Sequence, residues 1–167
     1  MGSINTTDFV QVVKENQGII NSICRLYYSD DEDIKDARQD IILQLWKSFP
    51  TFRGDSKIST WIYRIALNTV IAKVKTERKN KTNDPLSDSH LNGETSFVCA
   101  DDDIQQLLFL VNRLEATDKA IMILHFEGYS NKEIAETLKL TATNISTRMN
   151  RIKTKLKETF KTNCNGL

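Results

Sequence analysis

Polar and basic side chains fill most positions between residues 143 and 155, and the apolar residues among them recur at regular intervals. Ile145, Met149, Ile152 and Leu156 are spaced four, three and four residues apart, which predicts a helix with one buried face. On the opposite face, Asn150 carries an amide that can hydrogen-bond adenine. A guanidinium such as that of Arg151 favours guanine. This pattern of donors points to a helix that reads DNA bases.

Thr147 can also hydrogen-bond base edges, whereas Ser146 and Lys153 flank this face on one side and Asn144 and Lys155 on the other. Lysines are better suited to phosphates, which give affinity without sequence information. Arg148 falls close to the buried edge, so we expect its guanidinium to reach a phosphate or a carboxylate instead of a base. The candidate DNA-contacting residues are Thr143, Asn144, Ser146, Thr147, Arg148, Asn150, Arg151 and Lys153.

A second, shorter helix is predicted directly before this one. Ser130 and Glu133 have the spacing of a capping box, and Ala135 is small enough to let two helices cross closely. Residues 139–141 make a three-residue turn, with Thr141 as the next N-cap. The pattern predicts a helix-turn-helix. A plain two-helix hairpin with a basic face is the alternative, and Lys139 stands where such turns usually place glycine. A left-handed conformation there costs about 1 kcal/mol.

The charge distribution divides the chain into two parts. Seven basic residues against one acid lie between Lys57 and Lys81, and the same ratio recurs between Lys139 and Lys161. Residues 82–103 carry six acids and no base, together with Pro85 and Gly93. Two separated basic elements suit a protein that touches DNA at two places, although two solvated helix faces would give the same charges. We therefore predict domains at 1–81 and 104–162 joined by a flexible acidic linker at 82–103.

The hydrophobic periodicity predicts an all-α fold of two small helical domains. Apolar residues between Phe9 and Leu26 form one amphipathic helix or two short ones, and Ser29 with Glu32 is a candidate capping box. A helix carrying Ala37, Ile41 and Leu45 ends at Pro50, and the helix carrying Trp61, Ile62 and Ile65 follows a polar loop at 52–57. The second domain opens with a helix containing Ile104, Leu107, Leu108, Val111 and Leu114, followed by one that contains Ala120, Ile121 and Leu124 and ends at Gly128.

The composition argues against catalysis and against secretion. No phosphate-binding loop, nucleophile elbow or zinc-protease pattern is present, and the three cysteines are scattered. We expect no enzymatic activity, no cofactor, no metal site and no disulfide framework. The longest apolar runs are too short for a membrane span, and the polar N-terminus does not look like a signal peptide, so a cytoplasmic location is expected.

At this point the sequence resembles a known family. Residues 36–46 (DARQDIILQLW) and 52–69 (FRGDSKISTWIYRIALNT) look like sigma region 2, and residues 128–153 look like sigma region 4. Together, in this order and with a linker between, they resemble the extracytoplasmic-function (ECF) class of the sigma-70 family of RNA polymerase sigma factors. The resemblance implies a factor that binds core polymerase, recognises −10 and −35 promoter elements and initiates transcription.

The resemblance also implies partners and residue roles. The recognition helix would read the −35 element, and the polymerase contacts would be the β′ clamp helices and the β flap. Since ECF relatives are often held by an anti-sigma factor, such a partner is expected as well. The polymerase-binding candidates are Asp36, Gln39, Asp40, Leu43 and Trp46. The −10 candidates are Arg53, Lys57, Ser59, Thr60, Arg64, Asn68 and Lys73.

Three interpretations stay open from the sequence. Asp36 can serve only to favour a helix start through the helix dipole. Trp61 lies on the Ile65 stripe and is expected in the core, with a base-stacking role as the alternative. A helix-turn-helix regulator that binds symmetric half-sites as a dimer is the rival class, although residues 1–81 contain no heptad pattern for dimerisation.

Overall fold

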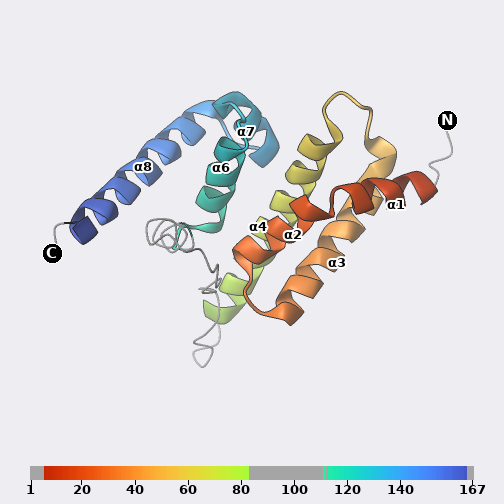
Figure 1. The fold of residues 1–167 in the computed structure, drawn as a ribbon, viewed down its shortest axis with the longest axis horizontal. Helices are drawn as coiled ribbons and strands as arrows, with labels where there is room; N and C mark the ends of the chain where they lie inside the picture. The colour runs from red at the N-terminus through yellow and green to blue at the C-terminus, as the bar shows by residue number, and fades with distance from the viewer. Residues whose placement is uncertain (1–5, 83–110, 112, 165–167) are drawn as a thin grey trace. The chain divides into compact units, whose positions relative to one another are not determined.

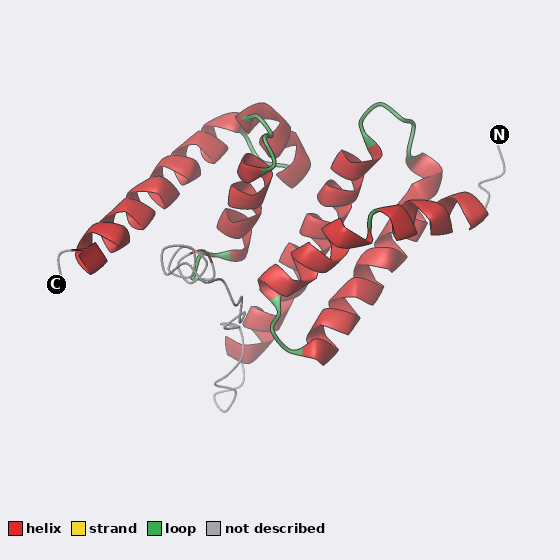
Figure 2. Ribbon diagram, in the orientation of Figure 1, coloured by secondary structure: helices red, strands yellow, loops and turns green. Residues whose placement is uncertain are grey.

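In the part of the chain that the structure describes, helices joined by loops are the only regular elements, which confirms the predicted all-α class (Figures 1 and 2). The structure is a computed structural model, and it describes residues 6–82, 111 and 113–164. The chain divides into two compact units, Met1–Thr95 and Ser96–Leu167. Within the described ranges, every helix is too short or too polar to cross a lipid bilayer.

The first unit contains α1 (Thr6–Glu15), α2 (Gln17–Tyr27), α3 (Asp31–Ser48), the short 3-10 helix η1 (Phe49–Thr51) and α4 (Ile58–Thr82). The periodicity between Phe9 and Leu26 therefore corresponds to two helices. The break falls at Asn16, whose side-chain amide donates to the carbonyl of Val12 at 2.8 Å. This bond competes with the regular helical pattern and ends α1 there.

The core of the first unit lies between α2, α3 and α4, each of which packs against the other two (Figure 1). Its largest side chains are at most 1% exposed: Ile20, Ile23, Ile41, Leu45, Ile62 and Leu67. On α2 and α3 these residues recur three and four positions apart, and on α4 the fully buried Ala66 lies between Ile62 and Leu67. Each of the three helices therefore buries one face in the core.

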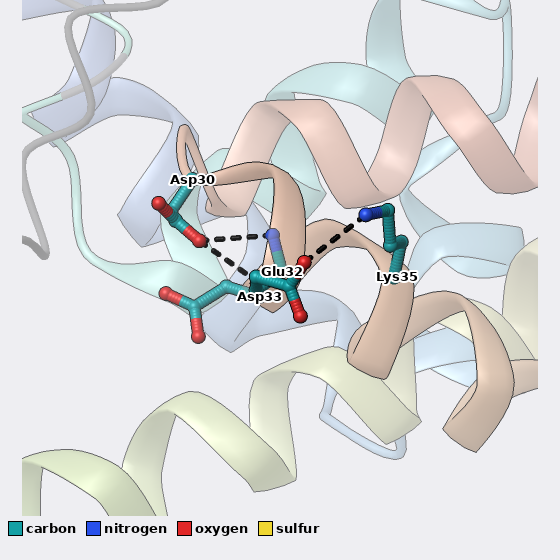
Figure 3. Close-up of polar contacts among 4 residues, drawn as sticks. All are labelled: Asp30, Glu32, Asp33 and Lys35. Carbon is teal, nitrogen blue, oxygen red and sulfur yellow. Dashed lines mark hydrogen bonds and ion pairs between the residues drawn. The ribbon is translucent and has the colours of Figure 1, made fainter.

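The start of α3 differs from the sequence-based prediction of a Ser29–Glu32 capping box. The N-cap is Asp30, one residue later, and its carboxylate accepts the backbone N–H groups of Glu32 at 2.9 Å and Asp33 at 3.4 Å (Figure 3). Glu32 instead forms an exposed ion pair with Lys35 at 3.1 Å. An aspartate caps as well as a serine and adds a negative charge at the positive helix end, so the prediction was wrong by one residue.

The second unit contains α6 (Ala116–Phe126), α7 (Asn131–Leu138) and α8 (Ala142–Cys164), which pack against one another. Its centre is formed by Ala120, Ile121, Leu124, Ile134 and Ile145, all fully buried. Past the end of α6, Gly128 takes a φ of 86°, which turns the chain at the predicted residue.

Part of the predicted organisation lies outside the described residues. Of the acidic linker predicted at 82–103, only Thr82 is described, and it is the last residue of α4. Of the helix expected at the start of the second domain, residues 104–110 are likewise outside, whereas Val111 is helical and buried.

Two leucines on α3 give a direct test of this core. Leu45 is fully buried and Leu43 is 48% exposed on the same helix. Replacing Leu45 by Ala should lower the free energy of unfolding of the first unit by roughly 2–5 kcal/mol, since it leaves a cavity. Leu43→Ala should change it by less than about 0.5 kcal/mol. Urea denaturation followed by circular dichroism measures both, and equal effects would contradict the packing described here.

Candidate nucleic-acid interface

The predicted helix-turn-helix is confirmed, beginning with its capping box. The Ser130 hydroxyl accepts the backbone N–H of Glu133 at 3.4 Å, and the Glu133 carboxylate accepts the backbone N–H of Ser130 at 2.8 Å. The Ser130 hydroxyl also donates to that carboxylate at 2.6 Å. These bonds lower the pKa of Glu133, because they favour its ionised form.

The turn between α7 and α8 has the predicted three residues. Lys139 takes φ 56° and ψ 43°, the left-handed conformation that glycine usually supplies at this position. Among the described residues other than glycine, no other has a positive φ. The Leu140 N–H donates to the Ala135 carbonyl at 2.9 Å, and the Thr141 hydroxyl accepts the Asn144 N–H at 3.2 Å. The turn therefore retains its hydrogen bonds in spite of the strained residue.

The apolar stripe of α8 faces inward as predicted. Ile145, Met149 and Ile152 are at most 3% exposed, and Leu156 is half-buried. The opposite face is open to solvent, and its exposed residues are Thr143, Asn144, Thr147, Asn150, Arg151, Lys153 and Thr154. A continuous row of hydrogen-bonding groups thus lies on the outer surface of the second helix of the motif.

Four of the predicted contact residues on α8 already have side-chain partners within this unit. The Thr147 hydroxyl donates to the Thr143 carbonyl at 3.0 Å. The Ser146 hydroxyl accepts from the side-chain amide of Asn131 at 3.1 Å. Arg148 donates from Nε to the Asn144 side-chain oxygen at 2.9 Å and from its terminal nitrogen to Asp118 at 2.6 Å. A carboxylate was one of the two partners expected for Arg148. Asp118 itself was missed, since no sequence signal relates two residues 30 positions apart.

In the first unit, the loop after η1 and the start of α4 surround a cavity of about 360 Å³. Gly54 takes a φ of 77°, which lets the loop turn tightly. Phe52 and Trp61 pack with ring centroids 5.1 Å apart and both line the cavity. The other lining residues are Ser48, Thr51, Arg53, Asp55, Ser56, Arg64 and Ile65.

The residues predicted to bind the −10 element divide between this cavity and the rest of α4. Arg53 and Arg64 are exposed and line the cavity, and Lys57 is exposed in the same loop. The half-buried members are Ser59, Thr60, Asn68 and Lys73. Phe52 and Asp55 were not among the sequence-based candidates. Trp61 is half-buried, so it belongs to the aromatic packing and also forms part of the cavity wall.

The outer face of α3 exposes apolar surface. Leu43 is 48% and Trp46 is 43% exposed, and Asp36 and Gln39 precede them on the same face. The Trp46 ring contacts Phe9 edge-on, with centroids 5.0 Å apart, so α1 supports it from one side. Val10 on α1 is also exposed, at 44%. Large apolar side chains grouped on a surface indicate a protein-binding face.

Asp40 does not share that face with the other predicted polymerase-binding residues. Its carboxylate pairs with the Lys73 ammonium at 2.7 Å and thereby joins α3 to α4. The ion pair combines one residue predicted to bind polymerase with one predicted to bind DNA. The Lys73 side chain is 26% exposed and that of Asp40 is 49% exposed, so each charge is partly offset by the other.

Cys24 lies in the core of the first unit and is fully buried. Burial raises the pKa of its thiol to about 11, an effect that the nearby charges of Arg38 and Lys73 only reduce. At neutral pH the thiol is therefore protonated and poorly nucleophilic. This agrees with a packing role for Cys24.

Comparison with known proteins identifies the family. The profile of sigma-70 region 2 matches residues 12–80, and that of sigma-70 region 4 matches residues 104–156. The two matches together cover most of the chain. The chain belongs to the sigma-70 family. Its region 2 contains the cavity and the exposed face of α3, and its region 4 contains the helix-turn-helix.

Curated relatives share both regions and place the chain in the ECF class. The chain is 26% identical over 143 residues to the RNA polymerase sigma factor SigZ of Bacillus subtilis, covering 81% of this chain and 77% of SigZ. It is 25% identical over 154 residues to the ECF sigma factor SigM of Mycobacterium tuberculosis, covering 89% of this chain and 74% of SigM. Sigma factors are transcription regulators and not enzymes.

Two solved structures share the fold. The sigma factor RpoE of Bartonella quintana, solved in complex with the anti-sigma factor NepR, is 18% identical and aligns with a TM-score of 0.75, covering 93% of this chain and 98% of that one. CnrH, solved with the cytosolic domain of CnrY, is 18% identical and aligns with a TM-score of 0.63, covering 95% of this chain and 91% of that one.

The capping box predicts a pH dependence of stability in region 4. The folded-state pKa of Glu133 lies below its ordinary value of 4.5, so its contribution to stability is present above pH 4.5 and is lost as the pH falls through the lower folded value. Replacing Glu133 by Ala should lower the melting temperature at pH 7, and the difference from the unmodified protein should narrow below pH 4.5. Thermal melts between pH 7 and pH 3 measure this.

The control is Glu136→Ala, which removes a second exposed carboxylate from the same helix. It should leave the melting temperature nearly unchanged at every pH. A Glu133 effect that does not vary with pH would show that its ionised carboxylate does not stabilise the helix.

Proposed function

We propose that this protein directs RNA polymerase to promoters by binding the −35 element through α8 and the −10 element through region 2. The observation that carries this proposal is the outer face of α8. Its apolar stripe is buried, and the donors Asn150 and Arg151 stand exposed on a helix-turn-helix. The second helix of such a motif enters the major groove.

The chemistry of α8 divides the proposed −35 contacts into two groups. Asn150 and Arg151 have free side chains on the outer face, and amide and guanidinium groups form paired hydrogen bonds with adenine and guanine. Lys153 and the threonines flank them and suit phosphates or single base edges. Ser146 and Asn144 lie beside this face, and each already accepts a hydrogen bond from another side chain of region 4. A contact to DNA would require these side chains to share or give up those hydrogen bonds.

The cavity in region 2 supports the proposed −10 contact. Its volume of about 360 Å³ falls within the range of sites that hold a small molecule. Opening DNA requires that unstacked bases are captured, and aromatic rings provide surfaces on which a base can stack. Trp61 and Phe52 provide such rings, and Arg53 and Arg64 beside them offer positive charge to the single strand. Lys57, Ser59, Thr60 and Asn68 extend the proposed contact along the loop and α4.

The exposed face of α3 supports the proposed contact with core polymerase. Asp36, Gln39, Leu43 and Trp46 lie on one side of the helix, and Trp46 is held by Phe9. We propose that this face binds the β′ clamp helices and that region 4 approaches the β flap. An anti-sigma factor is a further proposed partner, supported by the two structural neighbours that were solved with such factors.

The proposal for α8 is tested by run-off transcription with core polymerase on fragments of the source genome. The full chain should direct initiation at a defined set of promoters. Asn150→Ala and Arg151→Ala should each weaken promoter binding by about 1–3 kcal/mol, because each removes a paired contact to a base, and should relax selectivity at that position. Circular dichroism checks the fold of each variant. Unchanged selectivity in both variants would exclude these side chains from base recognition.

The proposal for α3 is tested by co-purification with core polymerase. The double variant Gln39→Ala, Leu43→Ala should reduce holoenzyme formation at least tenfold, as expected when residues at the centre of an interface are removed. The matched control is Gln44→Ala, an exposed residue of α3 next to this face. Holoenzyme that forms normally with the double variant would contradict the proposal. If the unmodified chain itself fails to co-purify in equal amounts, the rival class of dimeric regulator would be favoured instead.

A further inference from the structure

The helix α8 contains two arginines, Arg148 and Arg151. Of these two, only Arg148 forms an ion pair with a carboxylate on another helix in the described part of region 4. Its terminal nitrogen lies 2.6 Å from Asp118 on α6 and 3.9 Å from Glu115, which precedes that helix. Its Nε donates to Asn144 one turn earlier on α8 at 2.9 Å. Both sides of the planar guanidinium fork are therefore engaged.

The ion pair between Arg148 and Asp118 is partly buried, which distinguishes it from a fully exposed surface ion pair. The side chain of Asp118 is 16% exposed and that of Arg148 is 28% exposed. Ion pairs that are shielded from water are screened less by salt than fully exposed pairs. Hydrogen bonds that involve charged groups on both sides are also shorter and stronger than neutral ones. The contact can therefore fix the rotation of α8 as well as its distance from α6.

The position of Arg148 on α8 explains why that rotation matters. Arg148 lies between the buried stripe and the outer face, and Thr147 and Arg151 are its neighbours in sequence and on the next turn. Burial of Ile145, Met149 and Ile152 decides which side of α8 faces inward, but apolar burial is not a directional bond and does not fix the exact angle of the helix. A directional bond to α6 sets the angle at which the outer face is presented.

We propose that Arg148 is a positioning residue, held by Asp118, that orients the outer face of α8 toward the bases of the −35 element without contacting DNA. This inference rests on the proposed function of region 4. Because its charge is neutralised by Asp118, Arg148 contributes little to the general attraction of α8 for phosphates. The preference of region 4 for promoter DNA over other DNA, in contrast, depends on Arg148.

The alternative is that Arg148 contacts a phosphate, and the two roles predict different measurements. A phosphate contact contributes equally to all DNA sequences, and losing it lowers the slope of log affinity against log salt by about 0.9. A positioning residue changes the affinity for the promoter but not for unrelated DNA. Removing Asp118 separates the roles most clearly, because Asp118→Asn leaves the charge of Arg148 in place and free.

The experiment uses holoenzyme assembled from core polymerase and the full chain. The probes are a promoter duplex recovered by the run-off assay and a duplex of equal length with its −35 element scrambled. Asp118→Asn, Arg148→Gln, Arg148→Lys and the double variant Asp118→Asn, Arg148→Gln are compared over a range of salt concentrations. Lys153→Gln is the matched control, since it removes an exposed charge from the same helix.

Asp118→Asn and Arg148→Gln should each weaken promoter binding about tenfold, as expected for the loss of one charged hydrogen bond, and the double variant should be no weaker than either. Binding to the scrambled duplex should not weaken in Asp118→Asn, which frees the charge of Arg148. In the double variant, which removes both charges, binding to the scrambled duplex and the salt slope should not change. Arg148→Lys keeps the charge but loses the fork, so it should also lose selectivity. Lys153→Gln should weaken binding to both duplexes and lower the salt slope.

Promoter affinity that is unchanged or higher in Asp118→Asn would overturn the proposal, as would a lower salt slope in the double variant Asp118→Asn, Arg148→Gln. If Arg148→Gln does not fold by circular dichroism, Asp118→Asn and Arg148→Lys still decide the question. A failure of the unmodified holoenzyme to select any promoter would contradict the proposed function and is seen before any variant is measured.

Discussion

Ile145, Met149 and Ile152 bury one side of α8 against α6 and α7, and this burial decides which side chains α8 presents to solvent. Helical geometry places Asn150 and Arg151 on the far side as soon as the stripe is fixed. The capping box and the left-handed turn at Lys139 hold α7 where it can cover that stripe. The proposed −35 contact and the proposed positioning role of Arg148 both depend on this one packing arrangement.

In region 2, packing likewise decides which side chains are exposed, and it does so on two surfaces, the outer face of α3 and the cavity. The face of α3 opposite its buried residues Ala37, Ile41 and Leu45 presents Leu43 and Trp46. A chain of aromatic rings connects this face with the cavity, since Phe9 contacts Trp46 and Phe49 at 5.0 and 5.3 Å. Phe49 in turn lies 6.1 Å from Trp61 in the cavity wall. The α3 residues that we propose to face polymerase and the cavity-lining residues therefore share one packed cluster.

Charge pairing changes which basic and acidic residues remain available for binding. Lys73 and Asp40 neutralise each other between α3 and α4, and Arg148 and Asp118 do so between α8 and α6. From the sequence, Asp40 had been predicted to contact polymerase, and Lys73 and Arg148 had been predicted as candidate contacts to DNA. Arg64, Arg151 and Lys153, which we propose as contacts to DNA, are exposed in this fold.

The sequence by itself determined the features that depend on neighbours within one or two helical turns. These are the all-α class, the buried stripe of α8, the Ser130–Glu133 capping box and the turn at Lys139, because helical periodicity and capping act over a few residues. At Asp30 even local reasoning missed by one residue, since an aspartate and a serine compete equally for the same cap. Only the tertiary structure decided the Arg148–Asp118 and Asp40–Lys73 pairs and the walls of the cavity. The two ion pairs join residues 33 and 30 positions apart. Their geometry and the shape of the cavity depend on how whole helices pack, which no local pattern of residues records.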